Sequence, residues 1–81
     1  MPRQISMTAV KFIVSFNEHV AAKQVASMAT GMSAYGNVLP GSSEREFVVE
    51  VFRASKGPGL RVLLAQWEVH GFLHWDEGNS K

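Results

Sequence analysis

The stretch Leu60-Arg61-Val62-Leu63-Leu64-Ala65-Gln66-Trp67-Glu68-Val69 decides the fold of this chain. Its largest apolar side chains recur at i, i+3, i+4 and i+7, the spacing of one face of an amphipathic helix. These side chains are Leu60, Leu63, Leu64 and Trp67. The alternative is a hairpin with its turn at 57–59 and its second strand at 60–69. That strand would be apolar on both faces, which a very small domain has difficulty covering. The pattern therefore favours a helix.

The segment before this helix predicts two strands. Gly57-Pro58-Gly59 breaks the chain, and Pro58 suits the first turn of a helix because its missing amide has no partner there. Residues 45–54 predict a strand, since apolar side chains alternate with mixed ones. Its two faces carry Phe47, Val49 and Val51 on one side and Glu46, Val48, Glu50 and Phe52 on the other. Within residues 37–44, Val38 and Leu39 predict a short, weak strand before the turn at Pro40-Gly41.

The N-terminal half predicts a strand followed by a helix. Residues 8–16 alternate, and one face of this strand is strongly apolar. That face carries Val10, Phe12, Val14 and Phe16, and the other carries Lys11, Ile13 and Ser15. Residues 18–34 predict a helix with an apolar stripe that includes Val25, Met28 and Met32. We expect Asn17 to cap its start and Gly36 to form a left-handed cap past its end.

The C-terminal segment completes the order of elements. Gly71 ends the second helix, and residues 72–75 predict a last short strand. The resulting order of strand, helix, weak strand, strand, helix, strand is typical of a ferredoxin-like two-layer α+β sandwich. The alternative is a helix packed on an antiparallel β-meander. We expect one domain over residues 1–81, with loose termini at 1–6 and 77–81.

Composition excludes several classes of protein. The chain has 81 residues, 46% hydrophobic and 19% charged, which is globular composition and fits one domain. Its net charge of +1 gives no electrostatic case for nucleic acid or anionic membrane as a partner. The apolar stretches are far shorter than the ~20 residues that span a bilayer. It has no cysteine, which excludes disulfides and thiolate metal sites and leaves oligomerisation to support a thin core. We expect a cytoplasmic protein without a cofactor.

The candidate ligand or acid–base residues gather near the C-terminus. They are Glu68, His70, His74 and Asp76. Imidazole beside carboxylate suits metal binding or proton transfer, and in an extended chain all four side chains point to one side. Gly71 interrupts the spacing, and a Glu68 inside a helix leaves that side. The plainer interpretation is a solvated terminal strand, so no catalytic residue and no metal ligand is assigned.

Residues 12–35 resemble the opening strand, loop and helix of type 2 peptidyl-tRNA hydrolases. The resemblance rests on the alanine-rich helix that includes Gln24-Val25-Ala26-Ser27-Met28-Ala29-Thr30, and it covers less than a third of the chain. The basic glycine–lysine loop that precedes the helix in that family is absent, because Val20-Ala21-Ala22-Lys23 stands there. No site residue is carried over, and the chain is not assigned to that family.

The sheet face opposite the helices is the candidate interface. A two-layer fold leaves this face bare, and a contiguous apolar patch there marks a contact site. The residues expected on it are Ile13, Val48, Phe52 and Trp75. In the alternative, Lys11, Ser15, Glu46 and Glu50 make it an ordinary wet face. We expect a non-enzymatic binding or regulatory module that acts as a homodimer, with a further protein partner left open. The alternative function is a small ligand-binding protein or cofactor-free enzyme of the dimeric ferredoxin-like type.

Overall fold

The computed structural model describes residues 10–79 of the chain. Its elements are β1 (Val10–Phe16), α1 (Ala22–Met32), β2 (Gly36–Pro40), β3 (Glu46–Val51), the 3-10 turn η1 (Ala54–Lys56), α2 (Gly57–Val69) and β4 (Leu73–Asn79). Of the expected loose termini, residues 1–6 and 80–81 lie outside the described residues, whereas 77–79 belong to β4.

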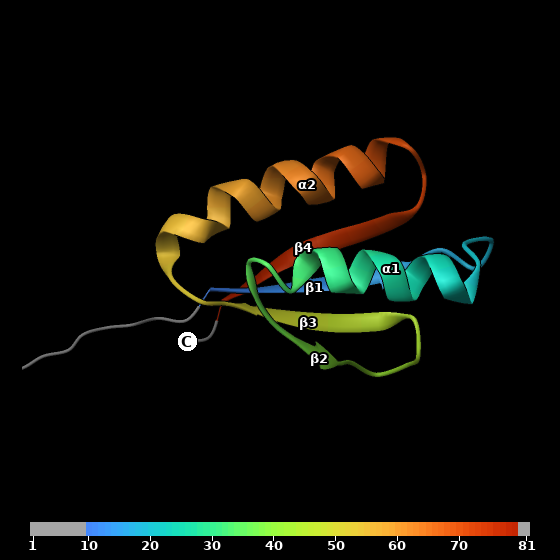
Figure 1. Cartoon of the computed structure of the whole chain (residues 1–81), viewed down its shortest axis with the longest axis horizontal. Coiled ribbons are helices and arrows are strands. Elements are labelled where there is room, and N and C mark those ends of the chain that lie inside the picture. The colour runs from blue at the N-terminus through green and yellow to red at the C-terminus, as the bar shows by residue number, and fades with distance from the viewer. Residues whose placement is uncertain (1–9, 80–81) are drawn as a thin grey trace, which may run out of the picture.

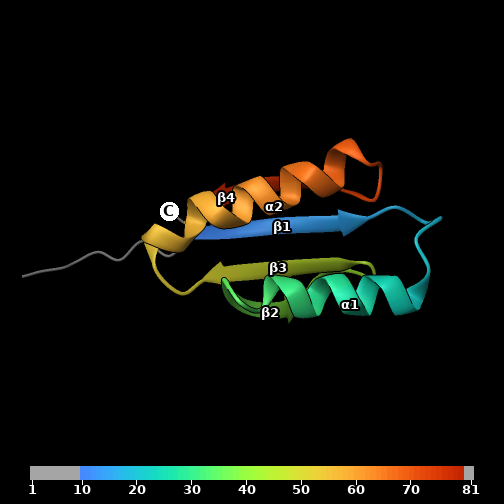
Figure 2. The same cartoon turned by 45° about the horizontal axis from the view of Figure 1, so that its top comes forward.

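The four strands form one antiparallel sheet in the order β2-β3-β1-β4. Both helices lie on the same side of this sheet (Figure 1), α1 over the half formed by β2 and β3 and α2 over the half that ends in β4 (Figure 2). The prediction of a mixed α+β fold is confirmed, and the arrangement is compatible with a ferredoxin-like two-layer sandwich. The weak strand is present as β2.

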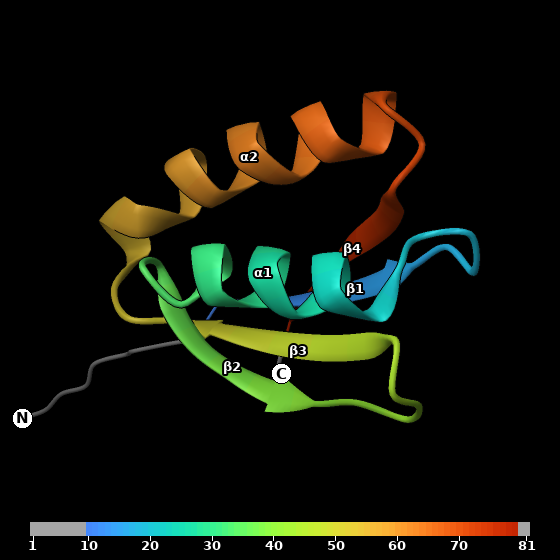
Figure 3. The ribbon, with the colours of Figure 1, turned by 45° about the vertical axis from the view of Figure 1, so that its right-hand side comes forward.

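The helix predicted from residues 60–69 is confirmed as the larger part of α2. Leu60 and Leu64 are fully buried, and Leu63 and Trp67 pack against the core as half-buried side chains. Figure 3 shows the helix layer and the sheet, and the buried side chains of the core come from both layers. Its buried members are Phe12, Val14, Phe16, Val20, Val25, Met28, Met32, Val49, Val51, Leu60, Leu64 and Leu73. The apolar faces predicted for β1, α1 and β3 are thus the faces that meet.

The first helix starts later than the sequence predicts. It begins at Ala22, and its N-cap residue Ala21 makes no side-chain cap hydrogen bond. Asn17 is not the cap. Its Nδ2 donates to the carbonyl of Gly71 at 2.7 Å, and its backbone N–H donates to the carbonyl of Phe72 at 2.9 Å. Asn17 therefore ties the end of β1 to the turn between α2 and β4.

Gly36 opens β2 and is not the left-handed cap that the sequence predicts. Among the described residues the one positive φ is at Gly71, at 80°. Gly36 is buried opposite Val51, and a Cβ at this position would lie 2.2 Å from the carbonyl oxygen of Glu50. The residue is small because β2 and β3 approach closely here, and not because the backbone turns.

The register of β4 places Trp75 on the side of the sheet that the helices cover. Trp75 pairs with Val14, which is fully buried, and its ring centroid lies 5.6 Å from that of Phe12. Directly paired residues of antiparallel strands point to the same face. Trp75 therefore packs against the core on the helix side of the sheet. The prediction that it lies on the open face is wrong.

Candidate functional site

The open face of the sheet carries an apolar row across three strands. Leu39 of β2, Val48 of β3 and Ile13 of β1 are neighbours in the register, and Asp76 of β4 continues the row. Leu39 and Ile13 are 39% and 38% exposed, and Val48 is half-buried. Within the described part of the chain, both helices lie on the other side of the sheet (Figure 3). The row is therefore in contact with solvent in the single chain.

Polar rows flank the apolar row on both sides. On one side Lys11 pairs with Glu50 in the register, and the Lys11 Nζ lies 3.8 Å from the Glu50 Oε2. On the other side Glu46 pairs with Ser15, whose neighbour on β4 is His74. The open face is thus an apolar centre between polar margins, which is the distribution found in many protein interfaces.

The Glu46 carboxylate is held by the β2–β3 turn. The backbone N–H of Ser42 donates to its Oε1 at 2.7 Å. This hydrogen bond favours the ionised carboxylate and lowers the pKa of Glu46 below its ordinary value. The margin of the open face therefore keeps a negative charge at Glu46 in mildly acidic solution.

Phe52 is an exposed apolar side chain just past the end of β3, beyond the polar row of Lys11 and Glu50. Its backbone N–H donates to the Tyr35 carbonyl at 3.0 Å, which continues the ladder between β2 and β3 by one position. The side chain is 56% exposed. Strand alternation places it on the side of Val48 and Glu50. Three of the four predicted interface residues thus lie on this side of the sheet, and Trp75 does not.

The predicted histidine and carboxylate cluster is divided between two elements. Glu68 belongs to α2, and His70 is the C-cap residue of that helix, where its ring stacks on Phe72 with centroids 5.8 Å apart. His74 and Asp76 belong to β4, on the open face. No group of three or more metal-ligating side chains occurs among residues 10–79. The four residues therefore do not form one site.

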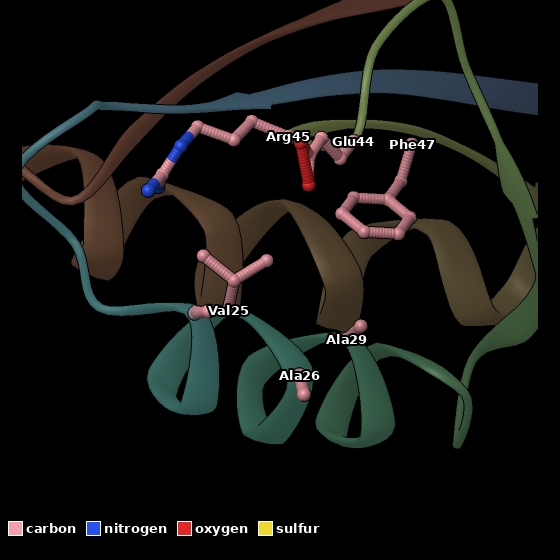
Figure 4. Close-up of a pocket in the computed structure, with 7 residues that line it drawn as sticks. Val25, Ala26, Ala29, Glu44, Arg45 and Phe47 are labelled. Atoms are coloured by element: carbon pink, nitrogen blue, oxygen red, sulfur yellow. The ribbon is translucent and has the colours of Figure 1, made fainter.

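A groove between α1 and the start of β3 is a site that the sequence analysis missed. It has a volume of about 400 Å³. The space exists because three residues of α1 that line it are alanines, whose side chains are small. On the opposite wall the Phe47 ring and the Glu44 carboxylate point toward the helix (Figure 4). The full lining is Ala22, Val25, Ala26, Ala29, Glu44, Arg45 and Phe47.

Arg45 closes one end of the groove and organises the loop before α1. Its Nη1 donates to the carbonyl oxygens of Asn17 at 3.0 Å and Val20 at 2.8 Å. The Asn17 carbonyl also accepts from the Val20 backbone N–H at 3.1 Å, so the guanidinium reinforces a turn that is already hydrogen-bonded. The wall of the groove therefore has a fixed shape. The signal in the sequence was the spacing of Ala22, Ala26 and Ala29 on one face of the helix, opposite a polar turn.

Comparison with known protein families, with curated proteins and with solved structures finds no match for this chain. The resemblance of residues 12–35 to type 2 peptidyl-tRNA hydrolases gains no support from these comparisons. In the portion that the structure describes, neither helix has the length and apolarity that a membrane crossing requires.

Proposed function

We propose that this chain is a non-enzymatic binding or regulatory module that acts as a homodimer, joined through the open face of its sheet. The observation that carries the proposal is the apolar row of Leu39, Val48 and Ile13 at the centre of that face. A chain of this size buries only about 60–65% of the surface that its unfolded form exposes. A second subunit on the open face adds the apolar burial that the single core lacks.

Charge substitutions on the two sides of the molecule test this proposal. Val48→Glu places a carboxylate in the apolar row, whereas Val62→Glu makes the same change on α2, where Val62 is 63% exposed. We expect the wild type and Val62→Glu to sediment as dimers at high micromolar concentration. We expect Val48→Glu and Phe52→Glu to shift toward monomer while they keep the circular dichroism of the wild type. A wild type that stays monomeric at these concentrations contradicts the proposal.

The groove between α1 and β3 favours a second candidate function, the binding of a small apolar ligand. Its walls are mostly apolar, with one carboxylate and one guanidinium at its margin, which is the usual composition of a small-molecule site. Anilinonaphthalene sulfonate is a suitable probe, because it joins an apolar ring system to one negative charge. If the groove binds ligands, the fluorescence of the probe rises when the wild type is added. It does not rise with Ala26→Trp, because the tryptophan fills the groove.

Ala65→Trp is the matched control for the groove, because Ala65 is exposed on α2 outside it. It should leave probe binding unchanged. Equal fluorescence from the wild type and from Ala26→Trp would remove this second function. A fluorescence increase that Val48→Glu abolishes would place the probe on the open face of the sheet.

A further inference from the structure

The charges of the open face are arranged so that the face is complementary to a second copy of itself. The inference rests on the proposed homodimer and deepens it by fixing how the two sheets lie on each other. The relevant arrangement is the register of β1 and β3, the two central strands. Lys11 pairs with Glu50, Ile13 with Val48 and Ser15 with Glu46, all on the open face.

A twofold axis between two facing sheets can run in one of two simple directions. In the first case the axis runs parallel to the strands, midway between β1 and β3. Each row of one subunit then faces the same row of the other subunit, but the order of the strands is reversed, so β1 faces β3. Lys11 then faces the partner subunit's Glu50, and Val48 faces the partner subunit's Ile13. With the 3.8 Å pair inside each subunit, the four charges alternate in sign around a square.

In the second case the axis runs perpendicular to the strands. Each strand then faces the same strand of the other subunit, and each polar row faces the opposite polar row. Glu50 then faces the partner subunit's Glu46, and Lys11 faces the partner subunit's Ser15. Like charges placed against each other across an interface oppose association. Only the axis parallel to the strands gives opposite charges and apolar contacts together, whereas both axes leave the strands of the two sheets aligned, as in usual face-to-face packing.

We infer that two copies of the chain pack sheet on sheet about a twofold axis parallel to β1 and β3, with Lys11 of each subunit opposite the partner subunit's Glu50. At the two edges of the face, where this central row ends, Leu39 comes near the partner subunit's Asp76. Asp76 is exposed on the edge strand β4, so its carboxylate keeps contact with water at the rim of the interface. The centre of the face therefore provides the affinity, and its polar margin sets the orientation.

The size of the face sets the strength of this dimer. Four strands spaced about 4.8 Å apart and six residues long, at about 3.4 Å each, give a footprint of about 400 Å² on each subunit. Two such footprints total about 800 Å², below the roughly 1,200–2,000 Å² of stable specific interfaces and in the range of weak, transient ones, so we expect a dissociation constant in the micromolar range or weaker.

Complementary charge reversal tests the arrangement in the full chain. K11E gives four negative charges at the square in its own homodimer, and E50K gives four positive charges. We expect each single variant to dimerise at least tenfold more weakly than the wild type. Mixed in equal amounts, the two variants restore opposite charges at both cross-subunit contacts, so we expect a heterodimer of near wild-type affinity. The double variant K11E/E50K keeps the alternation and should dimerise like the wild type.

Sedimentation equilibrium of the five samples, which are the wild type, the two single variants, their mixture and the double variant, separates the failure of this arrangement from the failure of the homodimer. A monomeric wild type overturns both. A dimeric wild type with no recovery in the mixture overturns the arrangement and leaves the homodimer in place. The axis across the strands makes the opposite prediction for one variant, because E50K would then place a lysine against the partner subunit's Glu46 and strengthen the dimer.

Discussion

Replacing Gly36 with alanine tests the structural reason for the glycine that opens β2. In the structure a Cβ at this position would lie 2.2 Å from the Glu50 carbonyl oxygen and 2.8 Å from the Val51 Cα. All of these obstacles are backbone atoms, so no side-chain rotation removes the clash. Alanine is accommodated only if β2 moves away from β3.

The cost follows from the size of that movement. An ordinary contact begins near 3.4 Å, so the two backbones must separate by about 1 Å. A shift of this size breaks or bends the local ladder, including the hydrogen bond from the Phe52 N–H to the Tyr35 carbonyl. One or two hydrogen bonds at about 1 kcal/mol each, with packing strain of about 1–2 kcal/mol, give a loss of about 2–4 kcal/mol. That is a large part of the stability of a chain this short, which is on the order of 5 kcal/mol.

Urea unfolding followed by circular dichroism measures the effect, and Gly31→Ala is its matched control. Gly31 lies inside α1, where a Cβ would rest 3.6 Å from the Trp67 Cη2, an ordinary contact. We expect this control to raise the free energy of unfolding by about 0.5–1 kcal/mol, because alanine favours a helix. Gly36→Asn decides between the two interpretations of the glycine. A left-handed cap tolerates asparagine, so a Gly36→Asn variant as stable as the wild type would refute the strand contact.

Two further variants test polar contacts on the helix side of the sheet. Arg45→Met removes the two hydrogen bonds that Nη1 donates to the Asn17 and Val20 carbonyls, so we expect a loss of about 2–3 kcal/mol in urea unfolding; a loss under about 0.5 kcal/mol would show that water replaces the guanidinium. The bidentate contact of Arg61 lowers the pKa of Glu77 below 4.5, so this pair stabilises the folded state above that pH and less as the pH falls through the folded pKa. Glu77→Gln should therefore be less stable than the wild type at neutral pH, and thermal unfolding curves should show the difference shrinking in acid; a constant difference down to strongly acidic pH would contradict this account.

The layers of the fold were predictable because they depend on periodicity. Alternation in residues 45–52 and helical spacing in residues 60–67 each place one apolar face, and two apolar faces in a small chain have to meet. The weak strand was also predictable, since the turn at Pro40-Gly41 leaves Val38 and Leu39 no other regular role. Each of these patterns involves residues that are close together in the sequence, so it can be recognised without knowledge of the tertiary structure.

The predictions that the structure contradicts concern residues whose contact partners are distant in sequence. Asn17 has the chemistry of a helix cap, but its amide reaches Gly71, 54 positions further on. Trp75 was placed on the wrong face because β4 combines apolar and charged residues on its covered side. Glu77 shares that side with Trp75, and its charge is balanced by Arg61 of α2, 16 residues earlier. A local pattern does not reveal such a partner.

The two candidate sites differ in the same way. The apolar centre of the open face was predictable from Ile13 and Val48, because strand alternation decides which side they face. The groove was not predictable from the sequence, because a cavity depends on which side chains of other elements leave the space empty. Ala22, Ala26 and Ala29 are ordinary helix residues until the structure places a strand and a turn opposite them.

The positions of these two sites make the two candidate functions compatible. The groove is lined by α1, which lies on the helix side of the sheet (Figure 2), and the proposed dimer contact belongs to the other side. Sheet-on-sheet association therefore turns both helix layers outward and leaves one groove open on each subunit. A ligand in the groove contacts α1, the turn before β3 and Phe47 of β3 itself, and β3 also carries Glu46, Val48 and Glu50 of the dimer face. Coupling between ligand and dimer therefore has a direct route through this strand, and a second one through Arg45, which lines the groove and binds the Asn17 carbonyl at the end of β1.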